Sequence, residues 1–281
     1  MMFDNTKYID EITDKLPEVL SILDDKLVYK PYYENFSYQF CWSSNHLEGN
    51  TLTLEETVQL IDFDEVKAGH KYSEYEEAKR LFSAISLLDP QGKIITEDWL
   101  KEVNQRILQS SEAGYRCENV YIANKIDAVY YPPDFSRVTE LMSGFAQTFN
   151  TVYDKKEALT ELAKRHIEFE HIHPFIDGNG RTGRMLLNQQ LINNGFLPVN
   201  ISSTSKYRRA FREFRNKQDI SAMVYLICKA ELAEMENVYS YVKAKERGLH
   251  AEDPLVFKGL IEKLNRDISE RQTEEIDEPE L

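Results

Sequence analysis

The segment His173-Pro-Phe-Ile-Asp-Gly-Asn-Gly-Arg-Thr-Gly-Arg184 lies between two stretches whose apolar residues recur at helical spacing. This spacing predicts one helix over 156–172 and another over 181–193. Between them, Gly178 and Gly180 allow the backbone to turn inward, because glycine adopts conformations that other residues avoid. The segment therefore predicts two helices joined by a short glycine-containing loop.

Helical spacing continues through most of the remaining chain. Thr53 and Glu56 form a capping-box pattern that begins a further helix, and Thr96 is expected to cap another. Pro31 is expected to mark a fresh helix start, and Gly49 is a natural helix end. The other expected helices cover 8–23, 33–47, 75–88, 136–149, 206–215 and 220–247.

A short stretch upstream of the loop has a different pattern. Residues 120–122 and 128–131 are rich in β-branched and aromatic residues, and Pro132 and Pro133 follow them. Such runs, separated by the polar residues 124–127, are typical of two short strands. The predicted fold class is therefore all-α, with one small β-hairpin.

Composition excludes several classes of protein. The 281 residues are 42% hydrophobic, which is enough for one large domain or two small ones. With 48 acidic against 34 basic residues, the net charge of −14 repels nucleic-acid phosphates and anionic lipids. The three cysteines lie far apart, which indicates reduced thiols. We therefore expect a cytoplasmic protein with neither a membrane nor a nucleic acid as partner.

The loop residues also suggest phosphate chemistry. Amides turned inward at Gly178 and Gly180, together with the N-terminus of the next helix, form an anion-binding nest. Arg181 and Arg184 add cations that grip phosphate. Asp177 would repel a bare phosphate, and it fits better as a ligand of Mg²⁺ that bridges phosphate oxygens.

His173 completes this set of groups, because its imidazole can take a proton near neutral pH. A plain helix–helix connector is the alternative explanation for the Gly-Asn-Gly sequence alone. The histidine, the aspartate and both arginines favour a phosphate-binding catalytic loop instead.

Residues 173–184 resemble, position by position, the signature of the Fic family, His-Pro-Phe-x-Asp/Glu-Gly-Asn-Gly-Arg-x-x-Arg. A looser similarity extends from about Thr96 to Glu231. The resemblance implies a mainly helical Fic fold with a β-hairpin flap. It also implies an enzyme that transfers AMP from ATP to a protein hydroxyl in the presence of Mg²⁺.

The resemblance assigns roles to individual residues. It implies that His173 is the general base for a Ser, Thr or Tyr hydroxyl, that Asp177 is the Mg²⁺ ligand, and that Phe175 packs the loop on the core. Residues 178–181 would cradle the α- and β-phosphates, and Arg184 would clamp the γ-phosphate. The implied nucleotide-binding residues are Asp177, Gly178, Asn179, Gly180, Arg181, Thr182, Gly183, Arg184, Ile122, Ala123, Asn124, Lys125, Tyr207 and Asn216.

Two of these assignments have alternatives. The hairpin would act as a flap that pairs with an extended target segment, or it is an ordinary surface hairpin. The stretch 206–217 would form a wall of the adenine pocket at Tyr207, or it is a solvated basic face. Arg208 stands where the family often carries a second tyrosine, so the nucleotide preference is left open.

A zinc site near the loop is a disfavoured alternative. The run His166-Ile-Glu-Phe-Glu-His171 departs from the His-Glu-x-x-His pattern. His166 and His171 are therefore interpreted as core and loop-supporting residues.

The segment Ser44-Asn-His-Leu-Glu-Gly49 resembles a second family signature, Ser/Thr-x-x-x-Glu-Gly/Asn. This resemblance implies an autoinhibitory helix that precedes the Fic core, with Ser44, Glu48 and Gly49 as its motif residues. Glu48 would pair with Arg184 and occupy the place of the γ-phosphate.

The resulting division of the chain has three parts: an N-terminal helical region over 1–92 with the inhibitory helix, a Fic catalytic core over 93–232, and a C-terminal helix with an acidic tail over 233–281. The expected function is a protein adenylyltransferase that uses ATP and Mg²⁺. Its expected partner is a protein presenting a hydroxyl, this chain itself included, and a homodimer is left open. Transfer of another phosphate-containing group, removal of AMP, and non-catalytic nucleotide sensing are the alternatives.

Overall fold

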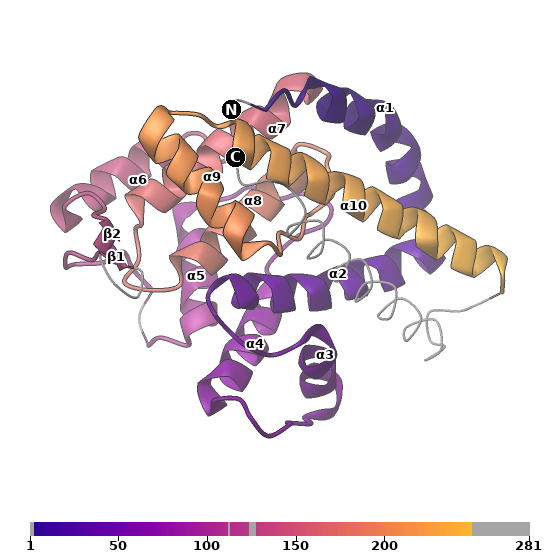
Figure 1. Ribbon diagram of the computed structural model, residues 1–281, viewed down its shortest axis with the longest axis horizontal. Coiled ribbons are helices and arrows are strands. Elements are labelled where there is room, and N and C mark those ends of the chain that lie inside the picture. Colours follow the sequence, from indigo (N-terminus) through magenta and orange to yellow (C-terminus); the bar gives the residue numbers. More distant parts are fainter. Residues whose placement is uncertain (1–2, 112, 124–127, 249–281) are drawn as a thin grey trace.

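The computed structural model describes residues 3–111, 113–123 and 128–248, and Figure 1 shows this part of the chain as a mainly helical molecule. None of its helices is both long and apolar enough to cross a membrane. The helices of this part are α1 (Thr6–Leu23), α2 (Lys26–Leu47), α3 (Leu54–Phe63), α4 (Tyr72–Ile85), α5 (Glu97–Leu108), α6 (Val138–Ala146), α7 (Lys155–Ile172), α8 (Asn179–Asn193), α9 (Thr204–Lys217) and α10 (Ser221–Glu246), with a 3-10 helix η1 at Phe135–Arg137.

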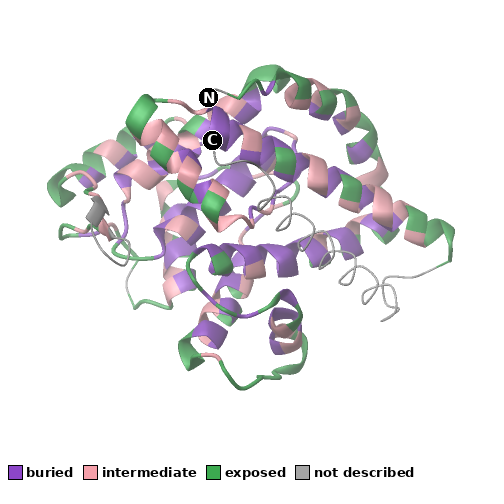
Figure 2. Cartoon of the chain, in the orientation of Figure 1, coloured by how far each residue is buried: buried purple, intermediate pink, exposed green. Residues whose placement is uncertain are grey.

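Two large hydrophobic clusters hold these helices together. In the first, α1 and α7 pack with α10, and Leu16, Leu159 and Ile227 are among its buried residues. In the second, α4 packs with both α2 and α5, and Phe36 and Leu100 are buried there. Helices α2, α7 and α8 contribute to both clusters, and most residues of α2 and α8 are buried (Figure 2). The loop between α7 and α8 is therefore anchored to the centre of the molecule.

Helix α2 begins earlier than the sequence predicted. The expected fresh start at Pro31 is wrong, because α2 begins at Lys26 and contains Pro31. Asp25 caps this end, and its side chain accepts a hydrogen bond from the Leu27 amide. Proline costs the helix one backbone hydrogen bond, and the burial of Pro31 and Tyr32 in the core helps to offset this cost.

The predicted helix starts at Thr53 and Thr96 are confirmed. The Thr53 side chain accepts from the Glu56 amide, while the Glu56 carboxylate accepts from the Thr53 amide. The Thr96 hydroxyl accepts from the amide of Trp99 at the start of α5. Each hydroxyl satisfies an amide that the first turn of its helix would otherwise leave without a partner.

The stretch expected to form a hairpin contains two very short strands, β1 (Ile122–Ala123) and β2 (Ala128–Tyr130). They pair antiparallel, with Ile122 opposite Tyr130. Asn124 and Lys125, two of the expected nucleotide contacts, lie outside the described residues. The Tyr130 hydroxyl donates to the His171 main-chain oxygen at 3.1 Å, so this strand rests against the end of α7.

Helix α10 places carboxyl groups inside the first cluster. Glu231 is 0% exposed, and its Oε1 accepts a hydrogen bond from the Leu197 amide at 2.9 Å. The pKa of Glu231 is raised to about 8, because burial and the neighbouring Glu234 carboxyl outweigh the lowering effects of that hydrogen bond and of Lys155. The folded protein therefore keeps a proton on Glu231 at neutral pH.

This proton makes stability depend on pH. The unfolded chain loses it near the ordinary glutamate pKa, so the contribution of Glu231 to stability falls as the pH rises towards about 8. Glu231→Gln removes the titration and keeps the acceptor oxygen. We expect it to raise the free energy of unfolding by about 1–3 kcal/mol at about pH 8.5 and by much less at about pH 5.5. Urea denaturation at both pH values would measure this difference.

The matched control is Glu236→Gln, because Glu236 is exposed on the same helix. It changes the net charge equally and should leave the pH dependence of stability unchanged. An equal gain from Glu231→Gln at both pH values would contradict the assignment of a buried proton.

Candidate active site

His173 caps the C-terminus of α7 in the left-handed conformation, with φ of +49°. Its Nδ1 lies 3.3 Å from the main-chain oxygen of Glu170. Because a carbonyl oxygen only accepts, Nδ1 carries the hydrogen and Nε2 is left to accept a proton. Burial lowers the pKa of His173. The imidazole is therefore neutral at pH 7 and suited to act as a base.

Arg116 holds the backbone on both sides of this histidine, and the sequence analysis did not identify it. The side chain is 4% exposed, and its Nε donates to the His173 oxygen at 2.9 Å. The Arg116 amide donates to the Pro174 oxygen at 2.8 Å. Two more bonds from the guanidinium reach the main-chain oxygens of Glu118 and Pro133, which flank the paired strands. One buried cation thus ties the loop to the β1–β2 segment.

The anion nest forms at the N-terminus of α8. Gly178 takes the left-handed conformation with φ of +73° and caps the helix, which begins at Asn179. This start is two residues earlier than predicted, so Gly180 lies in the first helical turn and does not turn the loop. The first amides of a helix have no partner within it, and they face the helix N-terminus with its partial positive charge. An anion is therefore favoured here.

The loop keeps its shape through side chain to backbone hydrogen bonds. Asn179 is 2% exposed, and its amide group both accepts from the Phe175 amide at 2.9 Å and donates to the Phe175 oxygen at 2.8 Å. Phe175 is itself 1% exposed in the second cluster. This confirms the expected packing of Phe175 on the core and makes Asn179 a brace of the loop.

Asp177 is exposed beside the nest. Its Oδ1 accepts from the Gly178 amide at 2.6 Å, and its main-chain oxygen accepts from Asn104 Nδ2 at 2.9 Å. Asn104 also donates to the hydroxyl of Thr182, which is 0% exposed. Asn104 on α5, which the sequence analysis missed, thus fastens both ends of the nest.

Arg184 projects from α8 into a buried site formed largely by α2. Its side chain is 3% exposed, and Nη2 lies 2.6 Å from Glu48 Oε1. Two further bonds of 2.8 Å reach the hydroxyl and the main-chain oxygen of Ser44. Glu48 and Arg184, which the resemblance implied would pair, are in contact in the structure.

The Glu48 carboxylate also lies against the first turn of α8, beside Gly180. A Cβ atom at Gly180 would collide with Glu48 Oε1 and would lie 3.0 Å from Arg184 Nη1. The glycine therefore leaves room for a carboxylate directly against the first turn of α8. Burial raises the pKa of Glu48, but the guanidinium of Arg184, helped by Arg181, outweighs it and the pKa lies below its ordinary value.

Tyr207 lies behind Arg184 in a buried network. Its hydroxyl is 2.6 Å from His166 Nε2 and 3.5 Å from Arg184 Nη1. Burial, together with Arg184, lowers the pKa of His166 to about 3, so this histidine is a neutral core residue, as expected. Asn216, by contrast, is exposed near the end of α9.

Among the described residues, no group of three His, Cys, Asp or Glu side chains is suited to hold a metal, so nothing there supports the disfavoured zinc alternative. His171 Nδ1 lies 2.8 Å from the Ile167 oxygen, within its own helix. Gly183 lies against α7, where a Cβ would collide with Phe169 and Glu170. The small residue there permits the close packing of α7 on α8.

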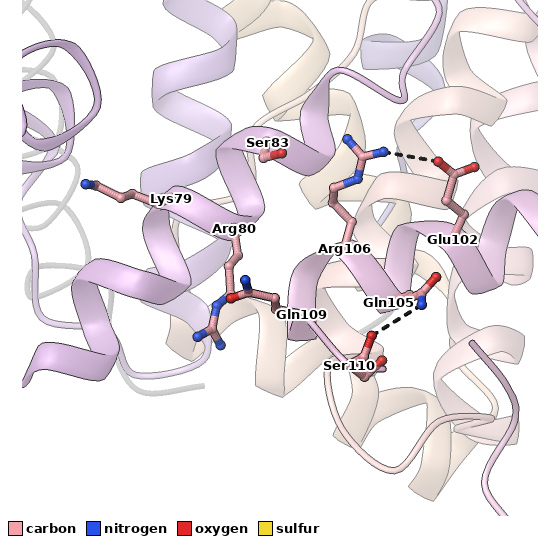
Figure 3. Close-up of a pocket in the computed structure, with 8 residues that line it drawn as sticks. All are labelled: Lys79, Arg80, Ser83, Glu102, Gln105, Arg106, Gln109 and Ser110. Atoms are coloured by element: carbon pink, nitrogen blue, oxygen red, sulfur yellow. Dashed lines mark hydrogen bonds and ion pairs between the residues drawn. The ribbon is translucent and has the colours of Figure 1, made fainter. Parts of the chain in front are cut away.

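A cavity of about 520 Å³ lies apart from these residues, along α4 and α5 (Figure 3). It contains none of the motif side chains, and a carboxylate already neutralises each of its basic groups. The pairs are Arg106 with Glu102, Arg80 with Glu76, and Lys79 with Asp64. Its lining residues are Lys79, Arg80, Ser83, Glu102, Gln105, Arg106, Gln109 and Ser110.

The chain is similar to known proteins. Residues 94–191 match the model of the Fic/DOC family. The chain is 31% identical to protein adenylyltransferase Fic of Nematostella vectensis over 202 residues, which cover 68% of this chain and 46% of that protein. It is 30% identical to the protein of the same name in Drosophila melanogaster, over 68% of this chain and 39% of that one. The chain is therefore similar to the Fic/DOC family over residues 94–191, and it spans less than half the length of these curated relatives.

Solved structures agree on the fold. A Fic domain containing signaling protein from Bacteroides thetaiotaomicron superposes with a TM-score of 0.72 at 23% identity, covering 88% of this chain and 99% of that one. Fic-1 from C. elegans superposes with a TM-score of 0.68 at 22% identity, covering 86% and 73%. The mainly helical Fic fold expected from the sequence is confirmed.

Proposed function

We propose that the chain is a protein adenylyltransferase, which transfers AMP from ATP to a Ser, Thr or Tyr hydroxyl of a protein. One observation carries this proposal: a neutral histidine with Nε2 left to accept a proton stands at the entrance of an anion nest that reaches a buried arginine. The relatives named protein adenylyltransferase support the same activity.

The proposed reaction is an in-line displacement at the α-phosphorus. The target oxygen forms a bond to the α-phosphorus, the bond to the oxygen bridging the α- and β-phosphates breaks, and pyrophosphate leaves. The hydroxyl proton goes to His173 Nε2. The amides of Gly178 to Arg181 would hold the α- and β-phosphates, and Arg184 would hold the γ-phosphate.

We propose that Asp177 holds Mg²⁺ together with phosphate oxygens. Its exposed carboxylate lies beside the N-terminus of α8, and carboxylate oxygen is a ligand that Mg²⁺ prefers. The ion, when bound, would neutralise charge on the phosphate oxygens. The single carboxylate suits Mg²⁺, which usually keeps several waters.

Asp177→Ala is expected to weaken Mg²⁺-dependent ATP binding and to lower AMP transfer by about 10²-fold, because it removes the proposed metal ligand. Transfer rates over a Mg²⁺ titration would measure the effect. Asp14→Ala is a matched control, since Asp14 is exposed on α1. Full activity of Asp177→Ala, or activity of the unmodified chain in excess EDTA, would overturn the metal assignment.

The β1–β2 segment is proposed as the flap on which an extended target segment docks. Its open strand edge would pair with the target backbone and present the hydroxyl to His173. Ile122 and the main chain of Ala123 would face the nucleotide, and the expected contacts Asn124 and Lys125 lie outside the described residues. The hydrogen bonds of Arg116 to the main chain beside both strands support this assignment, because they link the segment to the histidine loop.

Glu48 is proposed as an inhibitor that competes with the γ-phosphate for Arg184. Its carboxylate lies 2.6 Å from the guanidinium and fills the space above Gly180. ATP would then bind weakly, or with its α-phosphate misplaced. In the proposed division of the chain into 1–92, 93–232 and 233–281, helix α2 and Glu48 belong to the N-terminal region.

Radiolabelled ATP tests the activity. The Glu48→Gly chain is incubated with Mg²⁺ and ATP carrying the label at the α- or the γ-phosphorus, in parallel reactions. Incorporation of the α-label alone, into the chain or an added protein, supports AMP transfer. Incorporation of the γ-label indicates a kinase, and ATP binding without incorporation indicates a nucleotide sensor. Loss of label from a pre-modified protein without ATP turnover indicates removal of AMP.

A further inference from the structure

Glu170 places a carboxyl group next to the proposed base. It lies three residues before His173 on the last turn of α7, and its main-chain oxygen is the acceptor for His173 Nδ1. The carboxyl Oε2 lies 3.9 Å from the same nitrogen. The main-chain oxygen and the carboxyl group of Glu170 therefore both face His173 Nδ1, while Nε2 is the nitrogen left to accept a proton.

This carboxyl group is enclosed and only partly satisfied. The side chain is 12% exposed, and Oε1 is buried without a hydrogen-bond partner among the described residues. Oε1 lies against α8, within 2.6 Å of where a Cβ of Gly183 would be. A buried polar atom without a partner costs free energy, so a role in function would explain its presence.

Charged and titratable groups face Glu170 from each neighbouring helix. They are Arg184 on α8, Glu48 on α2, Tyr207 on α9 and His173 at the end of α7. The pKa of Glu170 is raised to about 8, because burial and the Glu48 carboxylate together outweigh the lowering effect of Arg184. The carboxyl therefore holds its proton at neutral pH and loses it in mildly alkaline solution.

We propose that Glu170 is a positioning residue for His173, whose ionised carboxylate strengthens Nε2 as the base for the target hydroxyl. The proposal rests on the adenylyltransferase function proposed above. The hydroxyl proton moves to Nε2, and the Nδ1 hydrogen stays on the ring, which becomes a cation. A carboxylate 3.9 Å from Nδ1 stabilises this cation, and a neutral carboxyl does not.

The pH dependence of catalysis tests the role. Glu170→Gln and the matched control Glu168→Gln are made in the Glu48→Gly chain. Glu168 is a suitable control because it lies on the same helix with its side chain 44% exposed. We expect the ratio of kcat/KM between the parent and Glu170→Gln to grow about tenfold from about pH 6 to about pH 9, because glutamine resembles only the protonated form. The ratio for Glu168→Gln should stay constant.

A constant ratio for Glu170→Gln across this range would overturn the proposal, because a purely structural loss lowers activity equally at every pH. The proposal would also be overturned if the ratio of kcat/KM between the parent and Glu168→Gln grew in the same way with pH. The readout thus separates an electrostatic contribution to the base from damage to the fold.

A second measurement needs neither turnover nor a substituted Glu170. In the unmodified chain, the His173 ring resonances, assigned by their loss in His173→Ala, are followed by NMR as the pH is raised. We expect one inflection below the ordinary histidine pKa and a second at about pH 8, where Glu170 ionises. A single inflection would overturn the proposal. If the second inflection appears but Glu48→Gly transfers no AMP, the adenylyltransferase proposal fails and the coupling of Glu170 to His173 stands.

Discussion

His173→Ala, made in the Glu48→Gly chain, is expected to lower AMP transfer by about 10²–10⁴-fold, the usual effect of losing a general base. ATP affinity should remain near that of the parent, because the proposed phosphate contacts come from α8 and not from the histidine. Initial rates of transfer of α-labelled AMP and calorimetric ATP binding would measure the two quantities separately.

The matched control for this change is His46→Ala. His46 is exposed on α2, so its loss should change neither rate nor affinity in the same background. Substantial AMP transfer by the His173 variant would remove this histidine from the proposed mechanism. A parallel loss of ATP affinity would show that the loop had collapsed and would require the rate to be reinterpreted.

Glu48→Gly is expected to raise both ATP affinity and the rate of AMP transfer, the rate by about 10–100-fold. The carboxylate and the γ-phosphate compete for one guanidinium, so removing the carboxylate frees the site. The Glu48 side chain is 39% exposed, and solvent screening therefore keeps the effect below that of a fully buried pair. Self-modification should increase with the rate.

Arg184 should keep its orientation in this variant, because both bonds to Ser44 remain. The cation is nevertheless left without its counterion, so the melting temperature should fall without ATP and recover when ATP binds. Glu48→Gln should activate less, since the amide still fills the space above Gly180. Glu34→Gln, at an exposed site of the same helix, is the charge control. Unchanged rate and affinity in Glu48→Gly would exclude the inhibitory role.

Local patterns predicted the helices well, and they failed where backbone geometry or tertiary packing decided the outcome. The φ angle of proline is compatible with a helix, and α2 continues through Pro31 despite the backbone hydrogen bond lost there, because the surrounding side chains are buried. The start of α8 at Asn179 follows from the left-handed turn at Gly178, which places the next residue directly in the helix. The spacing of apolar residues predicts neither effect, because it depends only on which positions are apolar.

The residues of the candidate site likewise differ in whether the sequence alone predicts them. The residues of one contiguous motif, from His173 to Arg184, were identified together because their spacing is itself the signal. Arg116 and Asn104 act on that loop from 57 and 73 residues away. Each is a single polar residue in a helix or loop without a pattern of its own. Only the folded structure shows that Arg116 and Asn104 reach the loop. The same is true of the Glu170 carboxyl group, which lies beside His173.

Helix α2 is built into the core, and this constrains how the proposed inhibition can be relieved. Fourteen of its 22 residues are buried, and it contributes to both large clusters. Displacing the whole helix would expose much of the interior and would approach global unfolding in cost. The Glu48 side chain, at the end of the helix and 39% exposed, can instead change rotamer while the helix stays in place. Exposed side chains exchange rotamers in about picoseconds to nanoseconds. Relief of inhibition would then be a fast equilibrium set by ATP concentration, without a slow opening step.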